Sequence, residues 1–244
     1  MKQINMKTYK NPIIVALDVS NKEKAFKLFD ILGQNAGALK IGLEMFIRFG
    51  PDIVKNAVER GAKIMLDLKL HDIPNTVQRA AANVSILGAD LLTIHTTGGK
   101  EMMRAARRGV EEAKEKSGVT GPKLLGVTVL TSISQDILKA ELGVDKSVQE
   151  QVVALALQAK EAGLDGVVAS PKEIKSIREA CGNDFLIVTP GIRPAGSSAD
   201  DQKRVCTPEQ AIADGADYLV IGRPILNAEN PVERLKEIVE SIIQ

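Results

Sequence analysis

Short apolar runs alternate with longer amphipathic stretches along the chain, and this alternation is the feature that most constrains its fold. The apolar runs are rich in Ile, Val and Leu and lack a period-two pattern, which is typical of strands buried on both faces. Strands of that kind form parallel sheets covered by helices. The predicted strands are Ile13–Leu17, Ala38–Ile41, Ile64–Leu66, Leu91–Ile94, Leu124–Leu130, Gly166–Ala169, Phe185–Val188 and Tyr218–Ile221.

The amphipathic stretches have the length of helices, and each follows one predicted strand. About eight strand–helix units close into a barrel, so we predict an α/β fold, a (β/α)8 TIM barrel. A chain of 244 residues suits one such domain and no linker divides it, so the barrel should span residues 1–244. The predicted helices are Lys22–Leu32, Phe46–Arg60, Thr76–Leu87, Lys100–Lys116, Val148–Ala162, Lys172–Ala180, Pro208–Asp214 and Val232–Ile243.

Two further observations favour the closed barrel over an open doubly wound sheet, which is the alternative architecture. Asp18-Val19-Ser20 follows the first strand, where a dinucleotide-binding domain would carry a Gly-rich turn. A weak repeat also precedes four of the strands. In it a glycine should end a helix in the left-handed conformation, with the strand starting two residues later. The repeat glycines are Gly61, Gly88, Gly163 and Gly215.

Composition limits the partners and the compartment. The net charge is +1, aromatic residues make up 3% of the chain and there is no Trp, so we expect neither nucleic-acid nor membrane-surface binding. Cys181 and Cys206 have no C-x-x-C spacing and should be unpaired thiols of a reducing compartment. The first apolar run stops at Asp18, too early for a signal segment or a membrane span. We therefore predict a cytoplasmic protein.

One charged motif, Asp67-Leu68-Lys69-Leu70-His71-Asp72, directly follows the apolar run of the third strand. Alternation along a strand would place Asp67 and Lys69 on one face. Asp72 falls just beyond, where Pro74 can open a helix, so the motif should form an acid–base–acid cluster. A solvated patch of surface ion pairs is the alternative. The buried strand in front of the motif favours a functional site, since the chemistry of parallel α/β proteins lies at the carboxyl ends of strands.

Polar residues end the other predicted strands as well, and in a closed barrel they would share one mouth. Asp18 and Lys40 follow neighbouring strands; they would bind a sugar diol or form a buried pair with each other. The polar stretch 191–204, after the seventh strand, suits a lid that closes over an anion. The strand-end residues are Asp18, Lys40, Gly42, Asp67, Lys69, Asp72, His95, Thr128, Thr131, Ser170, Arg193, Gln202, Gly222 and Arg223.

Gly222-Arg223, after the eighth strand, is a candidate phosphate site. Barrels often bind phosphate at the loops after strands seven and eight. A glycine lets backbone N–H groups approach an oxyanion, and an arginine offers a bidentate fork. The alternative is an exposed arginine beside a turn glycine.

The sequence argues against both a metal site and a nucleophilic serine. His71, His95 and the aspartates could supply metal ligands, but Lys69 between the carboxylates would repel a cation. The chain has no G-x-S-x-G elbow for a nucleophilic serine. We therefore predict no metal and no cofactor.

Taken in order, these motifs resemble the orotidine 5′-phosphate decarboxylase family in its bacterial form, and the resemblance covers essentially the whole chain. The D-x-K-x-x-D pattern alone is shared with related barrel decarboxylases and aldolases, some of which use Mg²⁺. Lys40 favours the first family, because the metal-using relatives are expected to carry an acidic residue there. The matching pieces are Ala16–Asp18, Leu39–Phe46, Asp67–Thr76, Thr128–Ser132, Thr189–Arg193 and Ile221–Ile225.

The resemblance implies a reaction and a role for each motif residue. Orotidine 5′-monophosphate would lose CO2 to give uridine 5′-monophosphate, the last step of de novo pyrimidine synthesis, without a cofactor. Lys69 would protonate the carbon, with Asp67 against the departing carboxylate and Lys40 and Asp72 completing the charge network. The alternative is a Mg²⁺-dependent sugar-phosphate decarboxylase or aldolase.

The resemblance also assigns the binding residues. Asp18 and Lys40 would hold the ribose, and Thr131 would lie near the pyrimidine. It implies a homodimer in which Asp72 and Thr76 reach the neighbouring subunit's site. The phosphate region would be bound by Arg193, Gln202, Gly222 and Arg223.

Overall fold

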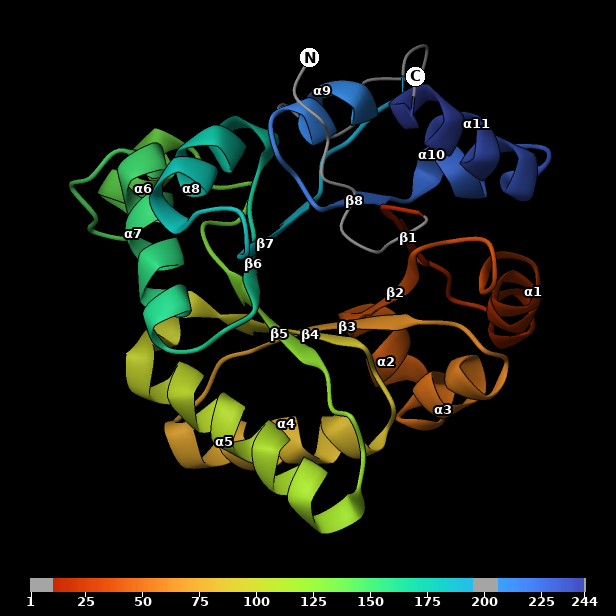
Figure 1. The fold of residues 1–244 in the computed structure, drawn as a ribbon, viewed down its shortest axis with the longest axis horizontal. Helices are drawn as coiled ribbons and strands as arrows, with labels where there is room; N and C mark the ends of the chain where they lie inside the picture. Colours follow the sequence, from red (N-terminus) through yellow and green to blue (C-terminus); the bar gives the residue numbers. More distant parts are fainter. Residues whose placement is uncertain (1–10, 195–205, 244) are drawn as a thin grey trace.

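Eight parallel strands form a closed barrel in the computed structural model, which describes residues 11–194 and 206–243. Each strand pairs with its sequence neighbours and β1 pairs with β8, so the ring is complete and the predicted TIM barrel is confirmed (Figure 1). The strands are β1 (Ile13–Ala16), β2 (Ala38–Gly42), β3 (Ile64–Leu70), β4 (Leu91–His95), β5 (Lys123–Val127), β6 (Gly166–Val168), β7 (Leu186–Thr189) and β8 (Tyr218–Ile221).

Helices surround the ring of strands on its outside (Figure 1). They include two short 3-10 helices, η1 and η2, which follow β4 and β6. The helices are α1 (Lys22–Leu32), α2 (Leu43–Phe49), α3 (Asp52–Glu59), α4 (Pro74–Ile86), η1 (Thr96–Gly98), α5 (Gly99–Ser117), α6 (Gln135–Ala140), α7 (Val148–Glu161), η2 (Pro171–Glu173), α8 (Ile174–Cys181), α9 (Pro208–Ala213), α10 (Arg223–Leu226) and α11 (Pro231–Ile243).

Several predicted elements have different bounds in the structure, and in two of them the local cause is plain. The helix predicted over 46–60 is two helices, α2 and α3, because Gly50 takes a left-handed φ of 68° that ends the first and Pro51 caps the second. The strand predicted to Leu130 ends at Val127. Thr128 then bonds to the carbonyl of Val168 through both its backbone N–H and its hydroxyl, and the chain turns out of the sheet.

The core has two layers, which explains why the strands show no alternation. One cluster fills the barrel and includes Ile14, Met65, Leu125 and Val188. The larger cluster lies between the strands and the helices, and Ile13 belongs to it. Side chains on both faces of the sheet are therefore buried, as the continuous apolar runs predict.

The glycine repeat marks the amino ends of strands. All four repeat glycines have left-handed φ values between 78° and 108°, as predicted. The strands β3, β4, β6 and β8 begin three residues after these glycines, not two. A buried apolar residue, such as Ala62 or Leu164, directly follows each glycine and anchors the turn in the core.

In three of these repeats the third residue is an aspartate that bonds to the strand before it. Asp90 accepts a hydrogen bond from Ile64 N–H at 2.8 Å. Asp165 accepts one from Leu124 N–H at 2.7 Å, and Asp217 accepts one from Ile187 N–H at 2.8 Å. We call these three contacts the floor links, because they lie at the amino end of the barrel. They join β4 to β3, β6 to β5 and β8 to β7.

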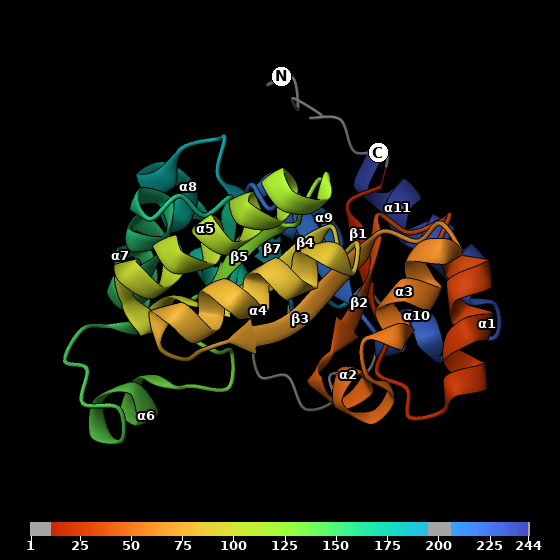
Figure 2. The ribbon, with the colours of Figure 1, turned by 90° about the horizontal axis from the view of Figure 1, so that it is seen from below.

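The opposite, carboxyl end of the barrel carries the polar residues of the sequence motifs. Figure 2 shows α2 and the protruding α6 on this side of the molecule. Pro74 occupies the first turn of α4 and so starts that helix soon after the charged motif of β3. In the described part of the chain, no helix is both long and apolar enough to cross a membrane.

Candidate active site

A bulge at the end of β3 sets the position of Lys69. Leu66 pairs with Leu92 and Leu70 pairs with Ile94, so β3 advances four residues where β4 advances two. Lys69 lies within this insertion and has a φ of 49°, the single positive value among the described non-glycine residues. The sequence predicted that Lys69 would reach Asp67 by regular strand alternation. The structure brings the two side chains together through a bulged, left-handed backbone instead.

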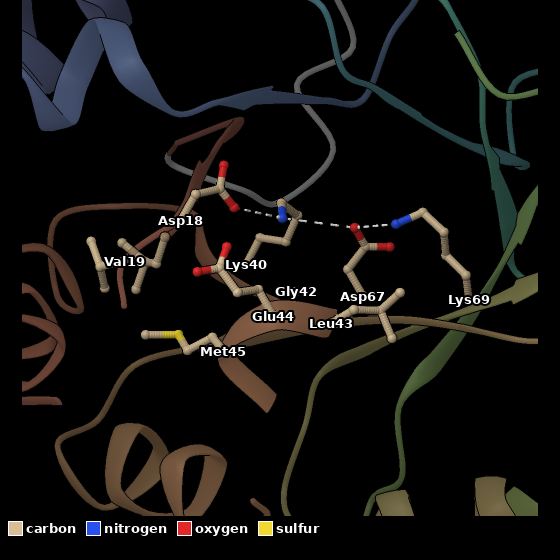
Figure 3. A pocket seen from close by; sticks show the side chains of 10 residues that line it. Asp18, Val19, Lys40, Gly42, Leu43, Glu44, Met45, Asp67 and Lys69 are labelled. Atoms are coloured by element: carbon tan, nitrogen blue, oxygen red, sulfur yellow. Dashed lines mark hydrogen bonds and ion pairs between the residues drawn. The ribbon is translucent and has the colours of Figure 1, made fainter. Parts of the chain in front are cut away.

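Four charged side chains form an alternating row across three neighbouring strands (Figure 3). Lys40 Nζ lies 3.5 Å from Asp18 Oδ1 and 3.7 Å from Asp67 Oδ2. Lys69 Nζ lies 2.8 Å from the same Asp67 oxygen. The side chains of Lys40 and Asp67 are 13% exposed, whereas Asp18 is 65% exposed. Asp18 and Lys40 therefore form a pair that is open to solvent on the Asp18 side, and the predicted alternative of a buried pair is wrong.

Asp67 is the electrostatic centre of this row. Burial, the largest single influence, opposes its charged form. The ammonium groups of Lys40 and Lys69 and hydrogen bonds from Lys69 and Thr93 act in the other direction, and together they hold the pKa of Asp67 below its usual range. The carboxylate is therefore ionised at neutral pH, although it is buried.

Thr93 is a site residue that the sequence analysis missed. Its side chain is fully buried, its hydroxyl donates to Asp67 Oδ1 at 2.9 Å, and its oxygen accepts from Lys69 N–H at 2.9 Å. Thr93 lies inside the apolar run of β4, so it was counted as part of a strand. The available signal was its position two residues before His95, which places both side chains on one face of the strand.

A cavity of about 120 Å³ opens beside the charged row. Five charged side chains line it, together with apolar side chains from α2 and from the segment after β1 (Figure 3): Asp18, Lys40, Glu44, Asp67 and Lys69. Gly42 keeps it open, because a Cβ at that position would lie 3.2 Å from the Lys40 ammonium. The cavity therefore offers two cations and three carboxylates to a small polar group.

Asp72 and Thr76 are not part of this row. Both residues are exposed, and Asp72 Oδ1 accepts a hydrogen bond from Ile73 N–H at 2.6 Å. Among the ion pairs of the described residues none includes Asp72. Within one chain the predicted acid–base–acid cluster therefore contains Asp67 and Lys69 but not Asp72.

The predicted phosphate residues follow β7 and β8. Arg193 is half-buried; its backbone N–H donates to the Cys206 carbonyl at 3.0 Å and its guanidinium to the Ile192 carbonyl at 2.9 Å. Gly222 caps α10, where a Cβ would lie 3.3 Å from Ala16, and the exposed Arg223 is the first residue of that helix.

Of the remaining predicted binding residues, the structure describes Thr131 but not Gln202. Thr131 is exposed in the turn after β5. Gln202 and residues 195–204 of the predicted lid lie outside the described residues.

Two histidines lie near the row without forming a metal centre. The rings of His71 and His95 are 5.3 Å apart. Burial, followed by the charges of His71 and Lys69, lowers the pKa of His95, so its imidazole is neutral at pH 7. Over residues 11–194 and 206–243, no three His, Cys, Asp or Glu side chains gather in a way that could hold a metal ion.

Comparison with known proteins identifies close relatives over nearly the whole chain. The family model described as "Orotidine 5'-phosphate decarboxylase / HUMPS family" matches residues 11–238. The orotidine 5′-phosphate decarboxylase of Moorella thermoacetica is 51% identical over 96% of this chain and 92% of that protein. That of Syntrophomonas wolfei is 49% identical over 93% of this chain and 95% of that protein.

Solved structures give the same result. The crystal structure of orotidine 5′-phosphate decarboxylase from Lactobacillus acidophilus superposes with a TM-score of 0.85 at 42% identity. The match covers 96% of this chain and all of that one. The enzyme from Pyrococcus horikoshii gives a TM-score of 0.75 at 28% identity, covering 95% and 99% of the two chains.

Proposed function

Because this chain belongs to the orotidine 5′-phosphate decarboxylase / HUMPS family, we propose that it converts orotidine 5′-monophosphate to uridine 5′-monophosphate and CO2 without a cofactor. This reaction is the last step of de novo pyrimidine synthesis. The single structural observation that carries the proposal is the row Asp18–Lys40–Asp67–Lys69 at the mouth of the barrel. Such a row would bring a cation to the carbon that loses CO2, where negative charge develops.

Lys69 is the proposed proton donor. Loss of CO2 leaves an electron pair on a pyrimidine carbon with little resonance stabilisation. An ammonium group held beside that carbon stabilises charge that develops only in the transition state, and then gives the carbon its proton. The ion pair with Asp67, at 2.8 Å, supports this role because it holds the ammonium group of Lys69 at the edge of the cavity.

Asp67 and Lys40 complete the proposed network. Asp67 would lie against the departing carboxylate, where its depressed pKa keeps it charged. Lys40 bridges Asp67 and Asp18, so it fixes the row while it shares the ribose hydroxyls with the exposed Asp18 carboxylate. Carboxylate oxygens accept the hydrogen bonds that a ribose diol donates.

The phosphate and base are proposed to bind at the loops after β5, β7 and β8. Arg193, Arg223 and the Gly222 amide would hold the phosphate together with Gln202, and Thr131 would lie near the pyrimidine. All of them follow carboxyl ends of strands, where barrels bind phosphate. Binding energy from the phosphate, which is remote from the reacting carbon, can then lower the barrier at that carbon.

We also propose a homodimer in which Asp72 and Thr76 complete the partner's site. Both are exposed and neither contacts the charged row of its own chain. An exposed apolar side chain lies between them in the sequence: Ile73 is 66% exposed. Apolar surface of this kind is typical of an interface.

We propose three further features of the protein. The chain forms one domain, which the closed ring from β1 to β8 supports. It acts in the cytoplasm, which fits the unpaired thiols Cys181 and Cys206. It binds no nucleic acid, as its net charge of +1 favours.

The Mg²⁺-dependent alternative is not favoured by the comparisons, since the curated relatives reported above are orotidine 5′-phosphate decarboxylases. The site agrees with them, because two ammonium groups lie within 4 Å of the carboxylate of Asp67 and would repel a divalent cation. Turnover of the nucleotide should persist after treatment with EDTA, and its loss would support the alternative.

Loss of the orotate chromophore tests the proposed function directly. The wild-type protein should consume orotidine 5′-monophosphate, and Lys69→Ala should lower kcat by about 1,000-fold or more, because it removes both the cation and the proton. Circular dichroism should show that the variant is folded. The matched control is Lys236→Ala, an exposed lysine of α11 whose one ion pair among the described residues is with Glu233. Full activity in Lys69→Ala would reject the assignment.

A further inference from the structure

We propose that Thr93 is the positioning residue that fixes both Asp67 and the backbone of Lys69 for proton transfer. This inference rests on the proposed function, since it concerns how the donor is held. Thr93 does not line the cavity, and among the described residues its hydroxyl forms hydrogen bonds with Asp67 and Lys69. It would therefore act through its neighbours and not on the substrate.

The bulge in β3 explains why a side chain is needed at this place. Residues 67–69 lie between the pairs Leu66↔Leu92 and Leu70↔Ile94, so Thr93 is the β4 residue that faces the insertion. Regular ladder pairing is interrupted there, and Lys69 N–H donates to the Thr93 hydroxyl at 2.9 Å. A buried N–H without a partner is unfavourable, so this contact supports the left-handed backbone of Lys69.

The direction of the two hydrogen bonds is fixed by chemistry. A backbone N–H can only donate, so the oxygen of Thr93 must accept from Lys69. The single hydroxyl proton of Thr93 is then given to Asp67 Oδ1, 2.9 Å away. A hydrogen bond donated to a carboxylate favours its charged form.

The two carboxylate oxygens of Asp67 therefore have different partners. Oδ1 is held by Thr93, whereas Oδ2 faces both Lys40 and Lys69. One hydroxyl thus orients the carboxylate, supports its ionisation and anchors the backbone that carries the amine. Aspartate and lysine are set relative to each other by a residue of the next strand.

A purely structural threonine is available for comparison on the same part of the chain. Thr96 is also fully buried, and its hydroxyl donates to the carbonyl of Val127 at 2.8 Å, with no contact to Asp67 or Lys69. Thr96→Val therefore removes a buried hydroxyl of equal burial without touching the charged row. Any loss that both variants share is a loss of stability alone.

The experiment compares Thr93→Val, Thr93→Ser and Thr96→Val by their kinetics and pH profiles. In Thr93→Val, kcat should fall by about 10- to 100-fold, while KM should change by less than about threefold. The acid limb of kcat/KM should move up by on the order of one pH unit, because the pKa of Asp67 rises when the donated hydrogen bond is lost. Thr93→Ser keeps the hydroxyl and should recover most of kcat. Thr96→Val should keep kcat and the pH profile.

Other results would contradict either the positioning role of Thr93 or the proposed function, and the experiment separates the two. If the wild type decarboxylates and Thr93→Val keeps its kcat and acid limb, the positioning role is wrong and the proposed function stands. If the wild type itself leaves the orotate chromophore unchanged, the proposed function is wrong. Should Thr93→Val fail to fold, Thr93→Cys replaces it, since a thiol is a weak donor and acceptor of similar size. Wild-type kcat in Thr93→Cys would overturn the inference.

Discussion

At the scale of single residues, two ammonium groups share one carboxylate oxygen. Lys69 and Lys40 lie 2.8 Å and 3.7 Å from Asp67 Oδ2. The buried carboxylate between them offsets the electrostatic repulsion of the two ammonium groups. Removing the carboxylate would leave two neighbouring cations without compensation. The row therefore works as a unit, and the effects of single substitutions in it should not add.

Arg223 gives a residue-scale prediction outside the row. It is exposed at the start of α10, so Arg223→Ala should leave the fold unchanged. We expect it to weaken binding of uridine 5′-monophosphate by about 10- to 100-fold, because a charge-assisted contact to the phosphate is lost. Binding of uridine, which has no phosphate, should stay as it was. Calorimetric titration of both ligands checks this, and a phosphate preference that survives would show that Arg223 does not bind phosphate.

Whether a site residue can be predicted from the sequence depends on its position relative to the strand. Lys69 and Asp67 stand out because charges follow an apolar strand. Thr93 does not, since a threonine inside a strand is common and its partners come from a bulge that alternation cannot predict. Asp72 stands out as strongly as Asp67, yet the structure separates the two because Asp72 lies past the strand, where its side chain bonds to Ile73 N–H.

At the scale of elements, the floor links and their arginines stabilise the amino end of the barrel. Arg178 of α8 has a side chain only 16% exposed and donates to the carbonyls of Gly182, Phe185 and Gly215 and to Asp217. Asp217 in turn accepts a hydrogen bond from Ile187 N–H of β7. One guanidinium thus ties the turns that precede β7 and β8.

We predict that Arg178→Ala lowers the free energy of unfolding by about 2–4 kcal/mol, since it leaves three carbonyls and one carboxylate, most of them partly buried, without their donor. The site lies at the other end of the barrel, so kcat at 25 °C should be unchanged. Chemical denaturation and the orotate assay measure the two effects. Arg234→Ala is the control, because among the described residues Arg234 forms an ion pair with Glu237 alone, whose side chain is 62% exposed, and its loss should cost less than about 1 kcal/mol. A stable Arg178→Ala protein would show that the turns hold without this residue.

Element bounds were less predictable than element order. Strand order and the repeat glycines follow from composition and local chain geometry, and both were predicted. The split of the helix over 46–60 depends on the left-handed Gly50, and the early end of β5 depends on a tertiary contact of Thr128 with Val168. Contacts between segments far apart in the sequence determine where such an element ends, and the local sequence pattern carries no information about those contacts.

At the scale of the whole molecule, the closed barrel gathers every strand end at one mouth, yet one chain does not supply the full set of predicted site residues. Asp72 and Thr76 remain exposed beside Ile73, and the proposed homodimer would place them in the partner's site. Catalysis and assembly would then depend on each other. Dilution that dissociates the dimer would lower the activity per subunit.

Mixing two inactive variants tests this arrangement. Lys69→Ala and Asp72→Asn should each be inactive alone, but in a mixed dimer one of the two sites receives a wild-type Lys69 and a wild-type Asp72. Random mixing after unfolding and refolding should therefore restore about a quarter of wild-type activity, since about half of the dimers are mixed and half of their sites are intact. If Asp72 served its own chain, every site would carry one defect and no activity would return. Each variant refolded alone is the control.

The floor links join the strands in twos rather than evenly around the ring: β3 with β4, β5 with β6, and β7 with β8. If the chain were cut between two such couples, for example between β4 and β5, each aspartate would stay in the same piece as the N–H group that it binds. A cut within a couple, for example between β3 and β4, would separate the aspartate from that N–H group. Two neighbouring strands with the helices between them are therefore the smallest piece of the chain that keeps one of these contacts whole.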